Sequence, residues 1–171
     1  MLKLRYYGDP ILRRRAMDVR TFDQSLAEVA AQLLEAMERE DGVGLAAPQV
    51  GLDLRLLVAL AMREPGDEEA QPVIMVNPEI LERSHDTWVY EEGCLSIPGI
   101  RGDVTRPLTI KVRYQDVHGK EHTVETEGMF ARILQHEIDH LDGKLFIDYL
   151  STADKALIRP KLRNISKLND E

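Results

Sequence analysis

The stretch that decides the fold is Ile133-Leu134-Gln135-His136-Glu137-Ile138-Asp139-His140, which contains the pattern His-Glu-x-x-His. In a helix, residues four positions apart lie on one face, so His136 and His140 can bind the same metal ion. Glu137 follows the first histidine, where its carboxylate can reach a metal-bound water. The pattern predicts a helix that carries a metal site, although a helix with two surface histidines would have the same letters.

The residues around this pattern predict that the helix is buried. Apolar side chains are spaced so that they cover most of its surface: Met129, Phe130, Ile133, Leu134, Ile138 and Leu141. A helix that is apolar on most sides belongs inside a domain, where ionisable groups need partners such as a bound metal. We expect this helix to begin near Gly128 and to end at Asp142-Gly143, because glycine commonly ends a helix.

Length and composition predict one globular domain that covers residues 1–171. Apolar residues make up 43% of the sequence and charged residues 30%, as in ordinary globular chains. The net charge is -8, from 22 basic and 30 acidic residues. This balance argues against nucleic-acid binding, sequence-specific binding included.

The sequence also bears on where the protein works. No run of about 18 apolar residues suggests a membrane span, and the N-terminus has no long apolar stretch of the kind found in secretory signals. Cys94 is the only cysteine, so no internal disulfide can form, as expected in a reducing compartment. We therefore expect a bacterial cytoplasmic protein, and a processed organellar form stays open.

Helices and strands are expected along most of the chain. A capped short helix should follow Asp9-Pro10, and longer helices should cover 23–40 and 151–168, the last kinked or broken by Pro160. Strands are expected at 55–60, 72–81 and 84–90, and as a hairpin at 108–114 and 122–126. Segments 63–71 and 91–99 should be irregular, and 144–150 should be extended.

The two histidines need a third partner, because catalytic zinc sites use three protein ligands and leave one position for water. The metzincin pattern would place a third histidine where this chain has Phe146. Thermolysin-like enzymes use a later glutamate, and the only glutamate after His140 is Glu171. Cys94 is the remaining strong donor, and it lies in an irregular Gly-Cys-Leu-Ser segment rather than on an apolar strand face. Cys94, His136 and His140 are therefore the candidate ligands.

Three short runs in this order resemble the signatures of the peptide deformylase family. They are Gly42-Val43-Gly44-Leu45-Ala46-Ala47-Pro48-Gln49, Glu92-Gly93-Cys94-Leu95-Ser96 and Gln135-His136-Glu137-Ile138-Asp139-His140. The resemblance extends over nearly the whole chain. It implies an α+β fold, with antiparallel β-sheets packed around the central helix, a long N-terminal helix and a C-terminal helix. It also implies removal of the formyl group from the N-terminal formyl-methionine of new polypeptides, with release of formate.

The resemblance assigns a role to each residue of the reaction centre. Cys94, His136 and His140 would bind one divalent metal, which lowers the pKa of a bound water. Glu137 would act first as general base and then as general acid. The side-chain amide of Gln49 and the backbone N–H of Leu95 would stabilise the tetrahedral oxyanion. The family points to Fe²⁺ as the native metal, while Zn²⁺, Ni²⁺ or Co²⁺ also suit thiolate and imidazole ligands.

Further residues are expected to bind the substrate. The backbone around Gly44 would pair with the peptide as an added strand. Five side chains are candidates for the methionine pocket: Val43, Tyr90, Met129, Ile133 and His136, with Arg132 near its mouth. Glu92 would brace the cysteine loop by pairing with Arg106, and Arg101 would hold the substrate backbone.

The C-terminal helix is basic in an otherwise acidic chain, which suggests a contact with the ribosome near the exit of the nascent chain. A solvated helix face would look the same. We expect that removal of the residues after Leu150 leaves activity on a formylated dipeptide and weakens ribosome binding.

Two other functions fit parts of the pattern. A zinc endopeptidase would need a third histidine or glutamate ligand, and neither is well placed. A binding protein with a structural metal would need four protein ligands, and the sequence offers three. Cleavage of an unformylated protein would favour the first alternative, whereas formate release from formyl-Met-Ala would favour a deformylase.

Overall fold

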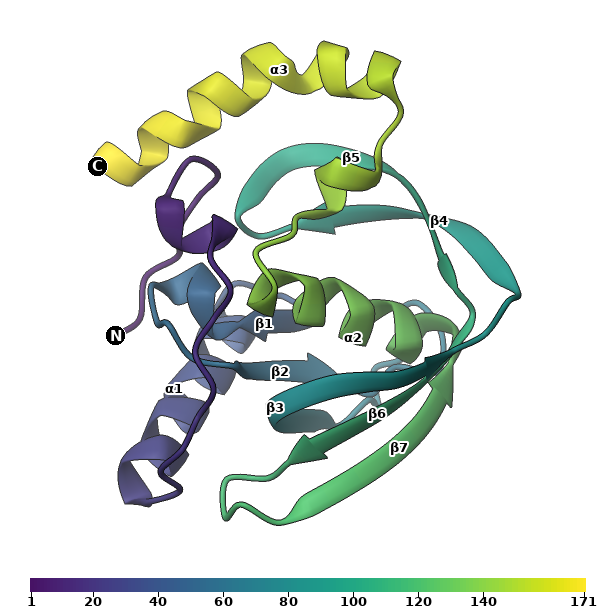
Figure 1. Cartoon of the computed structure of the whole chain (residues 1–171). Coiled ribbons are helices and arrows are strands. Elements are labelled where there is room, and N and C mark those ends of the chain that lie inside the picture. The colour runs from purple at the N-terminus through teal and green to yellow at the C-terminus, as the bar shows by residue number, and fades with distance from the viewer.

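The computed structural model describes residues 1–171 and places one helix between two antiparallel β-sheets. This central helix, α2 (Gly128–Leu141), carries the His-Glu-x-x-His pattern and is buried on most sides. The five-stranded sheet lies below this helix and the two-stranded sheet above it in the view of Figure 1. The fold is therefore α+β, as expected from the sequence.

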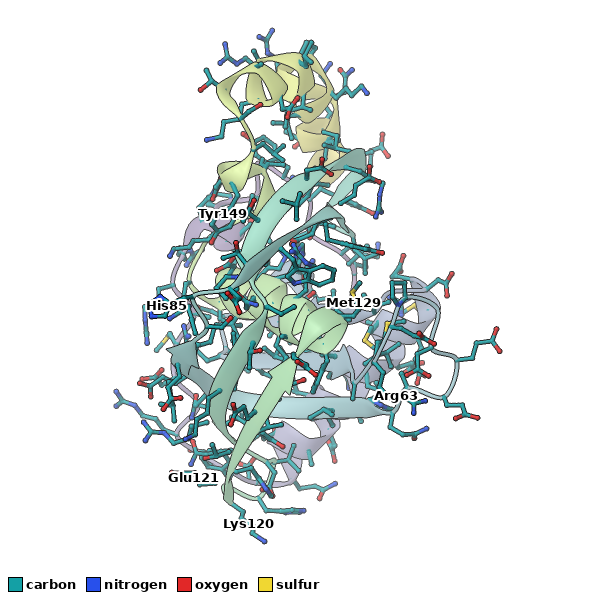
Figure 2. All side chains as sticks on the ribbon, turned by 90° about the vertical axis from the view of Figure 1, so that its right-hand side faces the viewer. Arg63, His85, Lys120, Glu121, Met129 and Tyr149 are labelled. Carbon is teal, nitrogen blue, oxygen red and sulfur yellow. The ribbon has the colours of Figure 1, made fainter.

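The five-stranded sheet has the order β1-β2-β3-β6-β7. Its strands are β1 (Gly44–Ala46), β2 (Leu56–Leu60), β3 (Pro72–Arg83), β6 (Thr109–Gln115) and β7 (Glu121–Glu127). The last two form the predicted hairpin, in which Val112 pairs with Val124. Figure 2 shows Lys120 and Glu121 at the tip of this hairpin. Because β1 pairs only with β2, the other edge of β1 has no neighbouring strand.

The remaining helices cover the sheets from outside. Helix α1 (Gln24–Arg39) begins where the Asp23 carboxylate accepts a hydrogen bond from the Leu26 backbone N–H, and it contacts β1 and β2. Helix α3 (Thr152–Ser166) lies over β5 and ends beside the N-terminal segment (Figure 1). No helix is both long and apolar enough to cross a membrane.

Three clusters of apolar side chains hold these elements together. The largest joins α2 to the five-stranded sheet, and the second joins α1 to the same sheet through residues such as Leu33 and Val58. The third joins the two-stranded sheet to the segment after α2 and to α3, through Phe146 and Leu162. Helix α2 is thereby fixed against the five-stranded sheet, so its polar side chains have defined positions.

The structure corrects three expectations from the sequence. Strand β4 (Thr87–Cys94) continues through the segment expected to be irregular, and its partner β5 (Ile97–Pro107) was missed because two glycines and two prolines conceal the strand pattern. Residues Phe146–Tyr149 form a short 3-10 helix within the stretch expected to be extended. Pro160 does not break α3, which continues past it because Leu162 and Ile165 beyond the proline pack into the third cluster.

Candidate metal centre and active site

The three predicted ligands meet beside α2. Cys94 comes from the end of β4, while His136 and His140 lie one turn apart on α2. The possible ligand atoms of these residues all lie within 4.8 Å of one another, and Cys94 Sγ is 3.3 Å from His140 Nε2. One thiolate and two imidazoles form a donor set typical of zinc, iron, cobalt or nickel. The residues present therefore fit a single divalent metal.

Glu92 fixes the orientation of the first histidine. Its Oε1 lies 2.9 Å from His136 Nδ1, which leaves Nε2 of the same ring free to face the metal position. Arg106 donates two hydrogen bonds to Glu92, and Arg132 donates a third. Burial opposes ionisation of Glu92, but the hydrogen bonds from His136 and Arg106 outweigh it and lower its pKa to about 2. Glu92 is therefore a fixed negative charge behind the ligand.

The two histidines differ in their surroundings. Burial lowers the pKa of His140 well below its usual value, which favours the neutral form that binds metals. Burial also acts against protonation of His136, but its hydrogen bonds with Cys94 and Glu92 prevail and raise its pKa well above the usual range. In the metal-free chain, His136 therefore holds a proton that metal binding must displace.

Glu137 lies between the ligands and is aimed at the same space. Its Oε2 atom is buried and has no hydrogen-bond partner in the protein, which suits a carboxylate that contacts a reacting water. Burial raises the pKa of Glu137 to about 7. A Cβ atom at Gly44 would lie 2.8 Å from Glu137 Oε1, so only glycine leaves room for this carboxylate. Glycine at position 44 therefore allows β1 to lie directly against the Glu137 side chain.

Gln49 is held with its amide nitrogen toward the candidate metal ligands. Its Oε1 accepts a hydrogen bond from the Ala46 backbone N–H at 2.9 Å. Its Nε2 donates to Ser96 Oγ at 3.2 Å and lies 3.4 Å from Cys94 Sγ. Leu95 follows Cys94 in the two-residue turn between β4 and β5, so both residues expected to bind the oxyanion adjoin the cysteine.

A cavity of about 540 Å³ opens onto this centre. Among its lining residues are all but one of the residues that the sequence analysis assigned to metal binding, catalysis or substrate binding: Val43, Gly44, Gln49, Tyr90, Glu92, Cys94, Leu95, Arg101, Met129, Arg132, Ile133, His136 and Glu137. His140, the exception, lies beneath the cavity and is almost fully buried. The structure thus gathers around one cavity residues from four separate parts of the sequence.

The sequence analysis placed Arg132 near the mouth of the methionine pocket, and the structure corrects this position. Its side chain is 3% exposed, and it donates hydrogen bonds to Glu92 and to the backbone carbonyl oxygens of Val104 and Trp88. Its guanidinium also lies over the rings of Trp88 and Tyr90. The correct position is therefore the inner end of the pocket, where Arg132 is fixed by its partners.

Other parts of the site were missed from the sequence. Met62, Pro65 and Gly66, which follow β2, line the cavity, and so do residues of β5. Figure 2 shows Met129 at the beginning of α2 and, further out, Arg63 on the loop that follows β2. No local pattern marks these positions, because they join the site only through the way the chain folds.

Comparisons with known proteins identify the family. The family model of polypeptide deformylase matches residues 1–156. A peptide deformylase of Cytophaga hutchinsonii is 48% identical over 163 residues, which cover 94% of this chain and 88% of the relative. The solved peptide deformylase of Plasmodium falciparum is 42% identical, with a TM-score of 0.89 over 98% of this chain and 97% of the other. That of Thermus thermophilus is 40% identical, with a TM-score of 0.89 and 99% of both chains covered.

Both the sequence identity and the matching structures extend over nearly the whole chain. The candidate cysteine and histidine ligands lie together inside a fold of the same kind. The chain therefore belongs to the polypeptide deformylase family and is a hydrolase that removes the formyl group from the N-terminus of nascent polypeptides.

Proposed function

We propose that deformylation takes place at the centre formed by Cys94, His136 and His140, with Glu137 as the acid–base group. The observation that carries this proposal is the convergence of the three donors and the unpartnered Glu137 oxygen beside one cavity. The bound metal would supply Lewis-acid activation of the attacking water. Every other step falls to side chains and backbone groups of this chain.

Glu137 moves the proton. Water attacks the formyl carbon and gives its proton to the Glu137 carboxylate, which then passes that proton to the leaving nitrogen as the C–N bond breaks. Formate and a free amine result. A pKa of about 7 suits both halves of this transfer near neutral pH, because the group can accept and release a proton with little bias.

Two donors stabilise the negative charge that develops on the formyl oxygen. The Gln49 amide is held by its bond from Ala46, so its N–H groups do not have to reorganise during the reaction. The Leu95 backbone N–H is the second donor, next to the thiolate of Cys94. Losing one donor of this kind typically costs on the order of 10²–10³ in rate.

The free edge of β1 supports peptide binding as an added strand. Backbone groups of Val43 and Gly44 would pair with the substrate backbone, which recognises a peptide without reading its side chains. Tyr90, Met129 and Ile133 would line the methionine pocket. Arg101 lies across Gly93 at the mouth, where a Cβ on the glycine would be 2.7 Å from its Nη1, and it would contact the substrate backbone.

We further propose that Fe²⁺ is the native metal, as the family resemblance implies; a thiolate and two imidazoles are suitable ligand types for Fe²⁺ as well as for Zn²⁺. The exposed basic side chains of α3 and of the residue that follows it would approach ribosomal RNA: Lys155, Arg159, Lys161, Arg163 and Lys167. We also propose a bacterial cytoplasmic location, where ribosomes make the substrate; a processed organellar form would meet the same kind of substrate. Equal ribosome binding by the chain and by a variant with these five residues changed to glutamine would exclude the contact.

Formate release tests the proposed function. Purified, metal-loaded protein should release formate from formyl-Met-Ala-Ser and leave acetyl-Met-Ala-Ser intact. Glu137→Ala should retain the metal and lose this activity. Undiminished formate release by the variant would remove Glu137 from the mechanism, and internal cleavage of an unformylated protein would point to an endopeptidase.

A further inference from the structure

The two loops that flank the candidate cysteine are joined by the N-terminal segment. The Arg5 backbone N–H donates to the Gln49 carbonyl oxygen at 2.7 Å, and the Tyr7 N–H donates to the Ser96 carbonyl oxygen at 2.9 Å. Residues 5–7 therefore bridge the segment Ala47–Val50, which carries Gln49, and the turn between β4 and β5, which carries Leu95. We call these two segments the oxyanion-binding loops. Ser96 also accepts a hydrogen bond from the Gln49 side chain, so this bridge and the active site share residues.

The bridge is itself held by one side chain from the far end of the chain. Asn169 Oδ1 accepts a hydrogen bond from the Tyr6 N–H at 2.9 Å. Asn169 Nδ2 donates to the carbonyl oxygens of Tyr6 and Tyr7 at 3.0 and 3.3 Å. Among the twenty side chains, only an amide supplies one acceptor and two donors in a single flat group. Asparagine therefore satisfies backbone groups that no strand or helix satisfies.

Close packing beside the amide limits the freedom of the bridge. Gly8 has a φ of 99°, and a Cβ at this position would lie 2.8 Å from the Cβ of Ser166. The turn after Tyr7 is thereby pressed against the end of α3. Figure 1 shows the N-terminal segment passing beside the C-terminal end of that helix.

We propose that Asn169 is a positioning residue for the oxyanion-binding loops, acting through the backbone of residues 5–7. This inference rests on the proposed function, because it concerns the placement of Gln49 and Leu95. It predicts a different outcome from the expectation that removal of the residues after Leu150 leaves activity on a dipeptide unchanged. The C-terminal segment then helps to position the active site, in addition to offering a basic surface for the proposed ribosome contact.

The expected effect is on the rate rather than on substrate affinity. We call the hydrogen bonds from Asn169 to the backbone of Tyr6 and Tyr7 the clamp. Loss of the clamp lets residues 5–7 move away from Gln49 and Ser96, so the oxyanion donors shift relative to the reacting carbon. A misplacement of about 1 Å can cost up to about 10² in rate. Because the shift here is transmitted through two loops, we expect kcat to fall about tenfold with KM changed less than about twofold.

Asn169→Ala tests the proposal in the full-length, metal-loaded chain, with formyl-Met-Ala-Ser as substrate. Asn164→Ala is the matched control, because Asn164 is exposed on α3 and lies outside the clamp. Rates are divided by metal content and by the folded fraction from circular dichroism. Asn169→Asp keeps the acceptor for Tyr6 and loses both donors, so its rate should fall between that of wild type and that of the alanine variant.

A double-mutant cycle separates positioning from simple loss of stability. On a Gln49→Ala background, Asn169→Ala should have a much smaller effect on kcat, because one of the donors that it positions is already gone. Equal fold losses on both backgrounds, or a normalised kcat for Asn169→Ala within twofold of that for Asn164→Ala, would overturn the inference. Absence of formate release by the wild-type chain would instead contradict the proposed function.

Discussion

Replacement of Glu92 by glutamine removes the charge on which the buried ion-pair cluster depends. Glu92 is 6% exposed and accepts hydrogen bonds from Arg106, Arg132 and His136. The Glu92→Gln variant has the same shape, but it leaves two buried guanidinium groups facing a neutral amide, and only Arg106 keeps another carboxylate partner, Asp139. Charges that lose their partner inside a protein destabilise it strongly, because water cannot replace the missing ion.

The pKa of Glu92 gives the size of the effect. Folding lowers this pKa from 4.5 to about 2, and each pKa unit corresponds to about 1.4 kcal/mol, so the charge stabilises the fold by about 3 kcal/mol. Because the folded-state pKa is lowered, this stabilisation is complete above the unfolded-state value of 4.5. It decreases as the pH falls toward 2 and is lost below it.

Urea unfolding of the metal-free protein checks this estimate across the pH range. At pH 7 we expect Glu92→Gln to lower the free energy of unfolding by about 3 kcal/mol, and near pH 2 the variant and the wild type should converge. Glu91→Gln is the control, since its side chain is 59% exposed and pairs with Arg101 at the surface; we expect a change below about 0.5 kcal/mol. A loss below 1 kcal/mol for Glu92→Gln, or one that does not depend on pH, would refute the reasoning.

Further predictions concern the reaction. Glu137→Gln should bind metal and lower kcat by about 10²–10⁴, as steady-state kinetics and metal analysis can show. Gly44→Ala should lower kcat at least about tenfold, because the new Cβ would meet the Glu137 carboxylate; a rate within twofold of wild type would contradict this contact. A chelator should abolish formate release. Because His136 must lose its proton when the metal binds again, calorimetry in buffers of different ionisation enthalpy should detect proton release. For the same reason, the affinity for the metal should rise with pH. Arg132→Met should raise the rate for formyl-Phe peptides relative to formyl-Met peptides, because it opens the inner end of the pocket. Arg106→Met is the control: it also removes a hydrogen bond to Glu92, but position 106 does not line the cavity, so this ratio should stay unchanged.

The sequence predicted the helical parts of the fold well because their signals are local. The period of apolar residues marked α1, and the apolar spacing together with the glycine at position 143 gave the limits of α2. Strand β5 was missed because its residues include two glycines and two prolines, which normally argue against a strand, although it pairs with the strand just before it in the sequence. Pairing across the sheet, which local patterns do not report, overrides these preferences.

The metal ligands could be predicted because few residue types bind such a metal and their spacing on a helix is fixed. Apart from the Glu92–Arg106 pair, which the family resemblance suggested, the residues that hold these ligands in place could not be predicted. The bond from Glu92 to His136, the buried position of Arg132 and the clamp of Asn169 on residues 5–7 join segments more than 35 residues apart. Charged and amide side chains have many suitable partners in a chain, so only the folded structure selects among them.

X-ray absorption at the metal edge tests the central claim most directly. The protein loaded with Fe²⁺ or Zn²⁺ should show one sulfur and two imidazole nitrogens, together with a light oxygen or nitrogen neighbour from solvent. The sulfur contribution should disappear in Cys94→Ser, and one imidazole should be lost in His140→Ala. A wild-type spectrum without sulfur, or one that Cys94→Ser leaves unchanged, would contradict the account.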